Sequence, residues 1–382
     1  MGPDLTRRFL VNSQGGEAVV TLKDVADAAG VSPSTASAAL RGMDIVKPLT
    51  RRKVIRQAQR LHYSTNVSAR ALRSGRSGIF TLIVPDLENG YYARLANSLS
   101  NRLFARNLKL IIQVSQYDKA KELRQIQELR SSMCDGLFVC STHNSAREIQ
   151  QVANGLPVLL FDDMSVQNQA CYDSIETPSR DGMTAAIRHL HACGRRRIGV
   201  VGGHQGALSA SHALSVTLRR NRYRQALDTM QDLGMDTSQA LVACDWSTPA
   251  GRRTAHALAR QGMPYDALCC MNDALALGVI RGLAECGLRV PEDVAVTGFD
   301  GIEPGAYSVP TLTTVAVDFT EMARMAVSMM LDHVGQQEGQ EDSARTPRRV
   351  IVGYHLLERE STLGIHPTNT VQRDSETQSK SI

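Results

Sequence analysis

Residues 21–40 read TLKDVADAAGVSPSTASAAL, and this stretch decides the fold of the amino-terminal part of the chain. Its first apolar residues recur at the i, i+3, i+4, i+7 spacing of one helix face. They are Leu22, Val25, Ala26 and Ala29. Gly30 suits the end of that helix, and Ser32 before Pro33 suits the cap and first turn of a second helix that runs to about Leu40. The stretch therefore predicts two short helices joined by a tight turn.

A third helix is expected over about residues 50–61. Val54, Ala58 and Leu61 fall on its inner face, while its arginines fall on the outer face. Three short helices with a tight turn between the first two are typical of a helix-turn-helix arrangement. The sequence therefore predicts a small helical domain over residues 21–65, preceded by a loose leader over residues 1–20.

The formal charge of the chain is only +5, but this charge is unevenly distributed. Residues 21–76 carry eleven basic side chains and three acidic ones, so the rest of the chain is slightly acidic. A basic head on an acidic body indicates that the head binds a polyanion. Taken alone, the same segment could equally be a solvated basic face.

From Ile79 onward, short apolar runs alternate with helical stretches. Continuous apolar strands between helices predict parallel sheets that are covered on both faces. The expected strands are 80–84, 110–114, 136–140, 157–161, 198–201, 241–244, 267–271 and 294–299. So many units exceed one ordinary sheet, and we expect an α/β body of two doubly wound subdomains. In such sheets ligands bind beyond the carboxyl ends of the strands.

The cysteines and the apolar runs indicate the cellular compartment in which the protein is expected. The eight cysteines are irregularly spaced and form no CxxC pair, so reduced, buried thiols are expected rather than disulfides or a metal site. Residues 1–20 lack the apolar core of a signal peptide, and no run approaches the roughly 20 apolar residues of a membrane span. We therefore expect a cytoplasmic protein with no membrane partner.

The common catalytic motifs are absent from the sequence. The glycine-rich run 199–206 lacks the GxGxxG spacing, and neither a GxxxxGK[ST] loop nor a GxSxG elbow occurs. His189 and His191 lie two residues apart on an expected helix and so point to different faces, which is poor geometry for metal ligands. The sequence therefore predicts no enzyme, no cofactor and no metal.

Two segments of the head resemble the lactose/galactose repressor family of transcriptional regulators. They are residues 21–37, TLKDVADAAGVSPSTAS, and residues 66–74, NVSARALRS. The resemblance implies that the first segment binds double-stranded DNA and that the second is the hinge helix of the family, which Asn66 can cap. Leu72 then corresponds to the leucine that enters the minor groove, where an apolar side chain can unstack a base step.

The resemblance also implies which residues contact DNA. Ala38 stands where the family often has an arginine, so direct readout of bases is expected to be weaker here. The hydroxyl groups and arginines of both segments suit phosphate contacts. The predicted DNA-binding residues are Thr21, Leu22, Ser32, Pro33, Ser34, Thr35, Ser37, Ala38, Arg41, Asn66, Ala69, Arg70, Leu72 and Arg73.

Segments 268–278, 290–300 and 310–315 extend the resemblance to about residue 362. They imply a body that resembles periplasmic sugar-binding proteins, with a small-molecule effector, most simply a sugar or sugar derivative, in the cleft between the subdomains. Arg219, Asn272 and Asp300 are the effector contacts that the resemblance implies. A guanidinium, an amide and a carboxylate together suit the hydroxyl groups of a polyol.

Three further residues are expected at the cleft, and two positions depart from the family pattern. Phe161 and Asp162 end another expected strand and are predicted to line the cleft, while Phe319 is predicted to stack on a sugar ring. Pro178-Ser179 stands where the family often has Asp-Asn, and Arg222 replaces the glycine before the aromatic residue. These two departures are expected to reshape the cleft, so the identity of the effector does not follow from the resemblance.

The sequence thus predicts a homodimeric repressor whose affinity for a DNA operator is controlled by an effector. We expect the leader at 1–20, the helix-turn-helix domain at 21–65, the hinge and linker at 66–78, the effector-binding core at 79–362 and a disordered tail at 363–382. Crossovers between the two subdomains are expected near 176–180, 314–318 and 345–350. The alternative is a solute-binding or enzymatic α/β protein with an incidental basic head.

Overall fold

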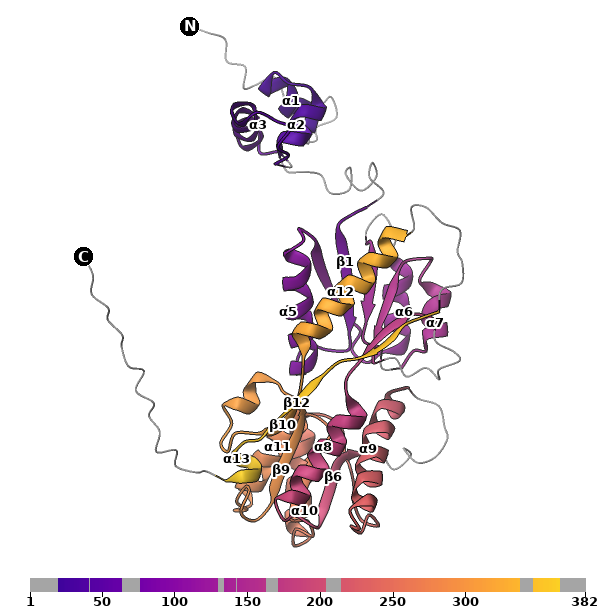
Figure 1. Cartoon of the computed structure of the whole chain (residues 1–382), viewed down its shortest axis with the longest axis vertical. Helices are drawn as coiled ribbons and strands as arrows, with labels where there is room; N and C mark the ends of the chain where they lie inside the picture. The colour runs from indigo at the N-terminus through magenta and orange to yellow at the C-terminus, as the bar shows by residue number, and fades with distance from the viewer. Residues whose placement is uncertain are drawn as a thin grey trace, which may run out of the picture. The chain divides into compact units, whose positions relative to one another are not determined.

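The structure of the chain, a computed structural model, describes residues 20–40, 42–63, 76–129, 134–141, 143–162, 171–203, 214–336 and 346–364. The chain divides into two compact units, Met1–Ser77 and Gly78–Ile382, which we call the head and the body. Figure 1 labels many of their helices and some of their strands. Within the described ranges, no helix combines the length and the apolar character needed to cross a bilayer.

The described residues of the head form three helices, α1 (Leu22–Ala29), α2 (Pro33–Leu40) and α3 (Pro48–Arg60). Gly30 ends α1 in the left-handed conformation at φ 63°, where a glycine avoids the strain of a Cβ atom. The small side chains of α1 and α2 close over Val54 and Ala58 of α3, and all of these residues are buried. The expected three-helix head is confirmed, whereas the expected hinge helix lies outside the described residues.

The body holds two six-stranded sheets, shown in Figure 1. The strands of the first sheet lie in the order β11-β5-β4-β3-β1-β2 and are parallel throughout. Those of the second lie in the order β12-β10-β9-β8-β6-β7, and only the edge strand β12 runs antiparallel to its neighbour. The two doubly wound subdomains expected from the sequence are therefore confirmed.

The strands of the first sheet are β1 (Ile79–Val84), β2 (Lys109–Val114), β3 (Gly136–Val139), β4 (Val158–Phe161), β5 (Asp173–Glu176) and β11 (Arg349–Ile351). Those of the second are β6 (Ile198–Gly203), β7 (Leu241–Ala243), β8 (Ala267–Cys270), β9 (Ala295–Asp300), β10 (Thr313–Val317) and β12 (Tyr354–Leu357). Four of them, β5, β10, β11 and β12, were not among the strands expected from the sequence. They are short and carry charged or hydroxyl side chains, so they lack the continuous apolar run that marks a doubly covered strand.

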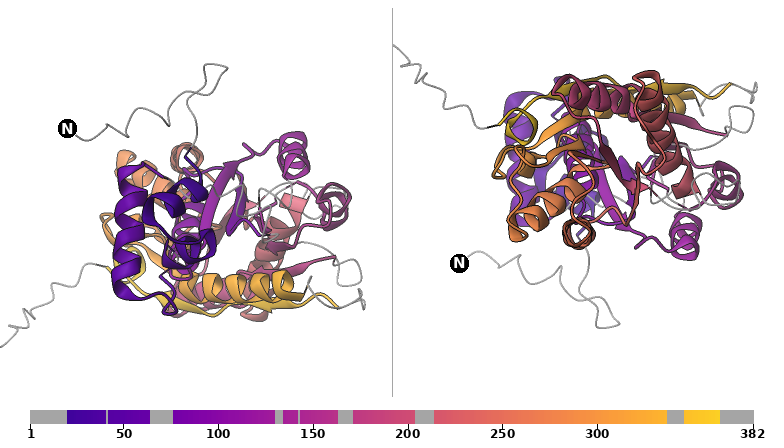
Figure 2. Two further views of the ribbon diagram at one scale, coloured as in Figure 1. Left: turned by 90° about the horizontal axis from the view of Figure 1, so that it is seen from above. Right: turned by 90° about the horizontal axis from the view of Figure 1, so that it is seen from below.

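Helices cover both sheets, as the end views in Figure 2 show. In the first subdomain they are α5 (Gly90–Phe104), α6 (Lys119–Glu128), α7 (Ala146–Val152) and α12 (Phe319–Gln336). In the second they are α8 (Ser179–Ala192), α9 (Leu214–Asp232), α10 (Thr248–Arg260), α11 (Asp273–Glu285) and α13 (Glu360–Leu363), with a short 3-10 turn at Glu303–Ala306.

Alternate residues of one strand face different helices. In β4, Leu159 and Phe161 belong to a core cluster that includes residues of α5 and α12, while Val158 and Leu160 belong to a second cluster that includes residues of α6 and α7. Because both faces of the strand are buried, every position is apolar. Strand β4 could therefore be predicted from the sequence as a continuous apolar run.

The chain passes between the two sheets three times. It leaves the first sheet after Glu176, returns from the second after Val317 and leaves again between Ile351 and Tyr354. The third passage comes after the range 345–350 that the sequence suggested, because residues 349–351 still pair with β5 in the first sheet.

Helices α10 and α11 of the second subdomain are in unusually close contact. A Cβ atom on Gly278 would lie 2.0 Å from the carbonyl oxygen of Thr248, and one on Gly251 would lie 2.2 Å from that of Leu275. Both obstacles are backbone atoms, which cannot rotate away. The two glycines therefore set the separation between the helices.

We expect Gly278→Ala to lower the free energy of unfolding by about 1–3 kcal/mol or more, because the added methyl group forces the two helices apart. Gly335→Ala is the matched control, since Gly335 lies in α12 with no atom within 4 Å of an added Cβ. It should raise the stability by about 0.4–1 kcal/mol. Denaturant titration of both variants measures the difference, and equal effects would contradict the close packing.

Candidate DNA-binding and effector sites

Hydroxyl groups cap the first two helices of the head. The Thr21 side chain accepts a hydrogen bond from Asp24 N, and the Asp24 carboxylate accepts one from Thr21 N in return. At the start of α2, Thr35 N donates to Ser32 Oγ over 3.2 Å, and Ser32 Oγ lies 2.8 Å from the hydroxyl oxygens of Ser34 and Thr35. These caps satisfy backbone donors at the helix starts.

The amino end of α2 is open to solvent. Ser32, Pro33 and Ser34 are exposed there, directly after the turn at Gly30. Helix starts carry partial positive charge, so this end can accept the phosphate oxygens of DNA. The exposed basic residues of the head add to this charge; they are Lys23, Lys47, Arg52, Lys53, Arg56 and Arg60.

Ala38 does not belong to this open surface. Only 5% of its side chain is exposed, and it packs in the core of the head with the neighbouring alanines of α2. The sequence-based prediction of a DNA contact by Ala38 is therefore corrected: a methyl group on the inner face of α2 cannot reach a base. Ser37 and Leu22 are half-buried. Six predicted contacts lie outside the described residues: Arg41, Asn66, Ala69, Arg70, Leu72 and Arg73.

A cavity of about 660 Å³ opens between the two subdomains of the body. The first subdomain contributes residues that follow the carboxyl ends of β1 and β2, and the second contributes the β7–α10 loop and the start of α11. Its polar and aromatic walls include Asp86, Glu88, Asn89, Gln116, Tyr117, Trp246, Ser247 and Thr248. Tyr117 donates a hydrogen bond to the Asp86 carboxylate. We call this space the outer cavity.

Arg222 of α9 lies buried beside the outer cavity, with 2% of its surface exposed. Its Nη1 donates to the carbonyl oxygen of Met271 over 2.6 Å, and its Nε donates to Ser179 Oγ over 3.1 Å. Its Nη2 donates to Thr177 Oγ1 over 3.3 Å and lies 3.8 Å from Asp300 Oδ1. The guanidinium group is thus bonded on every nitrogen.

Asp300 closes β9 and is the carboxylate partner of Arg222. Burial raises the pKa of the Asp300 carboxyl well above its usual range, and the charge of Arg222 acts against that rise. The residue has a φ of 112°, a backbone conformation that side chains other than glycine rarely adopt. Such strain persists only where the surrounding structure holds it, and it is often found at functional sites.

Asp162 links the two subdomains from the end of β4. Its Oδ1 accepts hydrogen bonds from the Thr177 backbone N over 2.7 Å and from Thr177 Oγ1 over 2.8 Å. Its Oδ2 accepts one from the Tyr91 hydroxyl over 3.1 Å. Since Thr177 also contacts Arg222, a chain of hydrogen bonds runs from α5 of the first subdomain to α9 of the second.

The other predicted effector contacts have different surroundings. Asn272 caps α11 by accepting from Leu275 N over 2.9 Å, and its amide donates to the carbonyl oxygen of Trp246 over 3.4 Å. Neither Asn272 nor Asp300 is among the residues that line the outer cavity. Arg219 lies in α9, but its side chain lies outside the described part of the chain.

Both phenylalanines predicted at the cleft are buried. Phe161 packs 6.3 Å from Phe138, centroid to centroid, in the core of the first subdomain. Phe319 meets the edge of Tyr91 at 5.3 Å and lies under the guanidinium of Arg94 at 5.1 Å. Each ring is 2% exposed, so in this structure neither offers the cleft surface that the sequence suggested. An apolar ring is more stable in the core than beside water.

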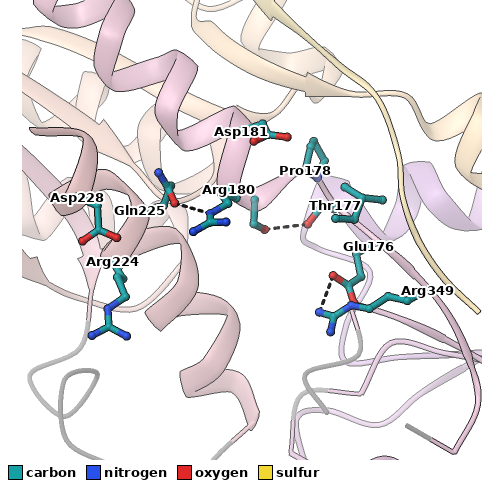
Figure 3. A pocket seen from close by; sticks show the side chains of 11 residues that line it. Glu176, Thr177, Pro178, Arg180, Asp181, Arg224, Gln225, Asp228 and Arg349 are labelled. Carbon is teal, nitrogen blue, oxygen red and sulfur yellow. Dashed lines mark hydrogen bonds and ion pairs between the residues drawn. The ribbon is translucent and has the colours of Figure 1, made fainter. Parts of the chain in front are cut away.

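A second cavity of about 350 Å³ lies beside the first passage between the sheets. Figure 3 shows Arg180 bonded to Gln225 on one wall and Arg349 bonded to Glu176 on another. Thr177 and Ser179, the two hydroxyl partners of Arg222, also line it. Within the described residues, no three His, Cys, Asp or Glu side chains gather closely enough to hold a metal ion.

Sequence reasoning missed two important residues of the cleft. It noted Arg222 only as a departure from a pattern, and it overlooked Trp246, whose indole nitrogen donates to the carbonyl oxygen of Gly202 over 2.7 Å. Trp246 is the single tryptophan of the chain and follows the end of a predicted strand, which was a usable signal. No pattern could show that Arg222 folds inward, because that depends on partners far away in the sequence.

The comparisons with known proteins agree with this geometry. A family model described as "Bacterial regulatory proteins, lacI family" matches residues 21–66, and one described as "Periplasmic binding protein-like domain" matches residues 187–362. The HTH-type transcriptional repressor PurR of Haemophilus influenzae is 29% identical over 340 residues, which cover 87% of this chain and 98% of that protein.

Two solved structures have the same fold. The lac repressor dimer, bound to operator and the anti-inducer ONPF, aligns with a TM-score of 0.74 at 23% identity and covers 91% of this chain and all of its own. The complex of the transcriptional regulator CelR with cellobiose aligns with a TM-score of 0.64 at 23% identity, covering 90% of this chain and 99% of its own.

Asp273 is a fully buried carboxyl group next to the cleft. It accepts hydrogen bonds from Thr314 Oγ1 over 2.6 Å and from Ile302 N over 2.8 Å, and so joins α11 to strand β10 and to the segment that follows β9. Burial raises the pKa of Asp273 to about 7, although these hydrogen bonds act in the opposite direction. Its protonation therefore changes near neutral pH.

The raised pKa of Asp273 predicts that the difference in stability between the wild type and Asp273→Asn depends on pH. A carboxyl whose pKa is higher in the folded state stabilises the fold fully below its unfolded pKa, and that contribution is lost as the pH rises through about 7. The stability of the wild type relative to Asp273→Asn should thus fall by about 3–4 kcal/mol between pH 4 and pH 8. Urea titrations at both pH values measure this, with the exposed Asp181→Asn as control; a pH-independent difference would refute it.

Proposed function

We propose that the chain is a member of the lacI family of bacterial regulatory proteins, a DNA-binding transcriptional repressor with an effector-binding domain, and that it acts as a homodimer on a roughly two-fold symmetric operator. It is a regulator and not an enzyme. We further propose that it works in the cytoplasm and that each head reads one half-site of the operator.

The exposed amino end of α2 is the observation that carries the DNA-binding proposal. Its cap residues follow a tight turn on the most basic part of the chain, so a helix start and several cations are available to the same phosphate backbone. The predicted contacts that lie outside the described residues, among them Leu72 in the hinge, would add minor-groove contacts at the centre of the operator.

The outer cavity supports a sugar or sugar-like effector. Its volume suits a small molecule, the Trp246 and Tyr117 rings provide apolar surface, and Asp86, Asn89 and Ser247 provide polar groups around them. Cellobiose is the ligand of the related CelR complex. A ligand held between the subdomains would change their closure and thereby the operator affinity, and linkage requires DNA to change the ligand affinity by the same factor.

Exposed apolar residues on the first subdomain support the dimer. β2 is the edge strand of its sheet, and Ile111 and Ile112 on it are 46% and 39% exposed. Phe104, at the end of the neighbouring helix α5, is 80% exposed. An exposed edge strand that carries apolar side chains is a common site of pairing with another chain. A second copy of the chain is the partner that we assign to this edge.

Operator binding tests the function directly. An operator selected from random DNA should bind the full chain with an affinity that falls steeply as salt rises, because several phosphates are neutralised at once. Leu72→Ala should weaken binding to that operator by about 1–3 kcal/mol while leaving binding to random DNA nearly unchanged.

Leu363→Ala is the control for this experiment, since Leu363 is a partly exposed leucine of the body. Equal losses on operator and random DNA would show that Leu72 has only a structural role. A flat salt dependence of the wild type would refute the proposed phosphate contacts.

The dimer is tested by placing a charge on the exposed edge. Ile111→Glu should raise the dimer dissociation constant at least tenfold, because an unpaired carboxylate would be buried in the interface. Sedimentation of the wild type and the variant measures this, with the exposed Leu87→Glu as control. A wild-type monomer, or a variant that dimerises as tightly as the wild type, would rule out this edge as the interface.

A further inference from the structure

The guanidinium group of Arg222 has the surroundings that a bound ligand would have. All three of its nitrogens have oxygen partners, contributed by Met271, Ser179, Thr177 and Asp300. A side chain from α9 therefore occupies a fully formed polar site.

Aromatic rings complete that site. The central carbon of the guanidinium lies 3.7 Å from the centroid of the Phe299 ring and 5.3 Å from that of Trp246. A flat cation over aromatic faces gains more when water is excluded, as it is here. The site combines one carboxylate, one carbonyl, two hydroxyls and two rings, a donor and acceptor set that fits a guanidinium better than an ammonium ion.

The position of Arg222 relative to the cavities is also informative. Its hydroxyl partners Thr177 and Ser179 line the smaller cavity, while its ring partner Trp246 lines the outer cavity. The side chain thus stands between the two. Through Thr177 and Asp162 it is connected to the Tyr91 hydroxyl on the first subdomain.

We call the polar site formed by Met271, Thr177, Ser179 and Asp300 the inner cleft. We propose that Arg222 is a tethered occupant of this inner cleft, which takes the place of a diffusible ligand at Asp300 and restricts any effector to the outer cavity. The tethered cation holds the two subdomains in one arrangement through the Thr177–Asp162–Tyr91 connection. Arg222 is therefore the residue that determines ligand specificity here: a neutral polyol is excluded from Asp300, and the vacated site would accept a small guanidinium compound.

Arg222→Ala in the full chain, with methylguanidinium as the probe, tests this proposal. The variant should melt several degrees below the wild type, and millimolar methylguanidinium should raise its melting temperature by about 2–4 °C, because a ligand that binds only the folded state stabilises it. Methylammonium at the same concentration should give less than half of that rise.

Arg224→Ala is the matched control, because Arg224 is an exposed arginine on the same helix. Neither it nor the wild type should be stabilised by methylguanidinium. Equal shifts in Arg222→Ala and Arg224→Ala, or no shift in either, would overturn the proposal.

Arg222→Met is the second variant, in case Arg222→Ala does not fold. It keeps most of the side-chain volume and removes only the charge and the donors, so it leaves the Asp300 carboxyl without its cation. Its melting temperature should fall relative to the wild type more at pH 8 than at pH 5, because without the cation the pKa of the Asp300 carboxyl lies still further above its unfolded value. A variant as stable as the wild type at both pH values would show that Arg222 merely fills space.

The consequence for DNA rests on the proposed function and is measured separately. The operator affinity of Arg222→Ala should differ from that of the wild type by at least tenfold, and methylguanidinium should restore at least half of the difference on a logarithmic scale. If the wild type binds no operator, the proposed function is wrong. The melting experiment still tests whether the Arg222 guanidinium occupies the inner cleft. If the variant melts as expected but binds operator like the wild type, the coupling of the inner cleft to the head is refuted.

Discussion

The passage of the chain between two mostly parallel sheets is the constraint on which the body depends. Parallel strands all end at the same edge of a sheet, so the loops that follow β1 and β2 meet those that follow β7 and β8 across one cleft. Polar residues such as Asp162 and Asp300 lie at strand ends because the central strands themselves are buried on both faces. The position of the outer cavity, of Asp300 and of Asp162 follows from this arrangement.

Burying a charged carboxylate at that cleft costs free energy, and each carboxyl group is stabilised by different partners. Asp300 is compensated by a guanidinium, Asp162 by the Thr177 backbone and two hydroxyls, and Asp273 by one backbone and one hydroxyl donor together with a raised pKa. An isolated ionised carboxylate could not remain in such surroundings. Asp162 therefore connects the first subdomain to the passage at Thr177, while Asp273 and Asp300 hold elements of the second subdomain together beside the cleft.

The head is stabilised by close packing of small side chains and by helix caps. Its core is made of alanines and valines that let three short helices approach closely, and its polar residues are used at the helix starts. Hydroxyl caps stabilise these helix starts because the first backbone donors of a helix have no partner within the helix itself. Ala38 packs in the core of the head and Ser34 is exposed, although they lie only four residues apart on one helix.

Local and periodic features were readable from the sequence. The caps and the glycine turn specified the helices of the head, and doubly covered strands such as β4 and β8 appeared as continuous apolar runs because both of their faces are buried. The positions of Asp162 and Asp300 at strand ends followed from the same runs. Whether a side chain at the cleft faces the core, a cavity or a distant carboxylate was decided only by tertiary packing. Phe161 and Phe319 turned into the core, and Arg222 met Thr177, Met271 and Asp300 from segments 45 or more residues away. Spacing along the chain reports the period of a helix or strand, whereas contacts between elements depend on how the sheets and helices pack, and no local pattern encodes that.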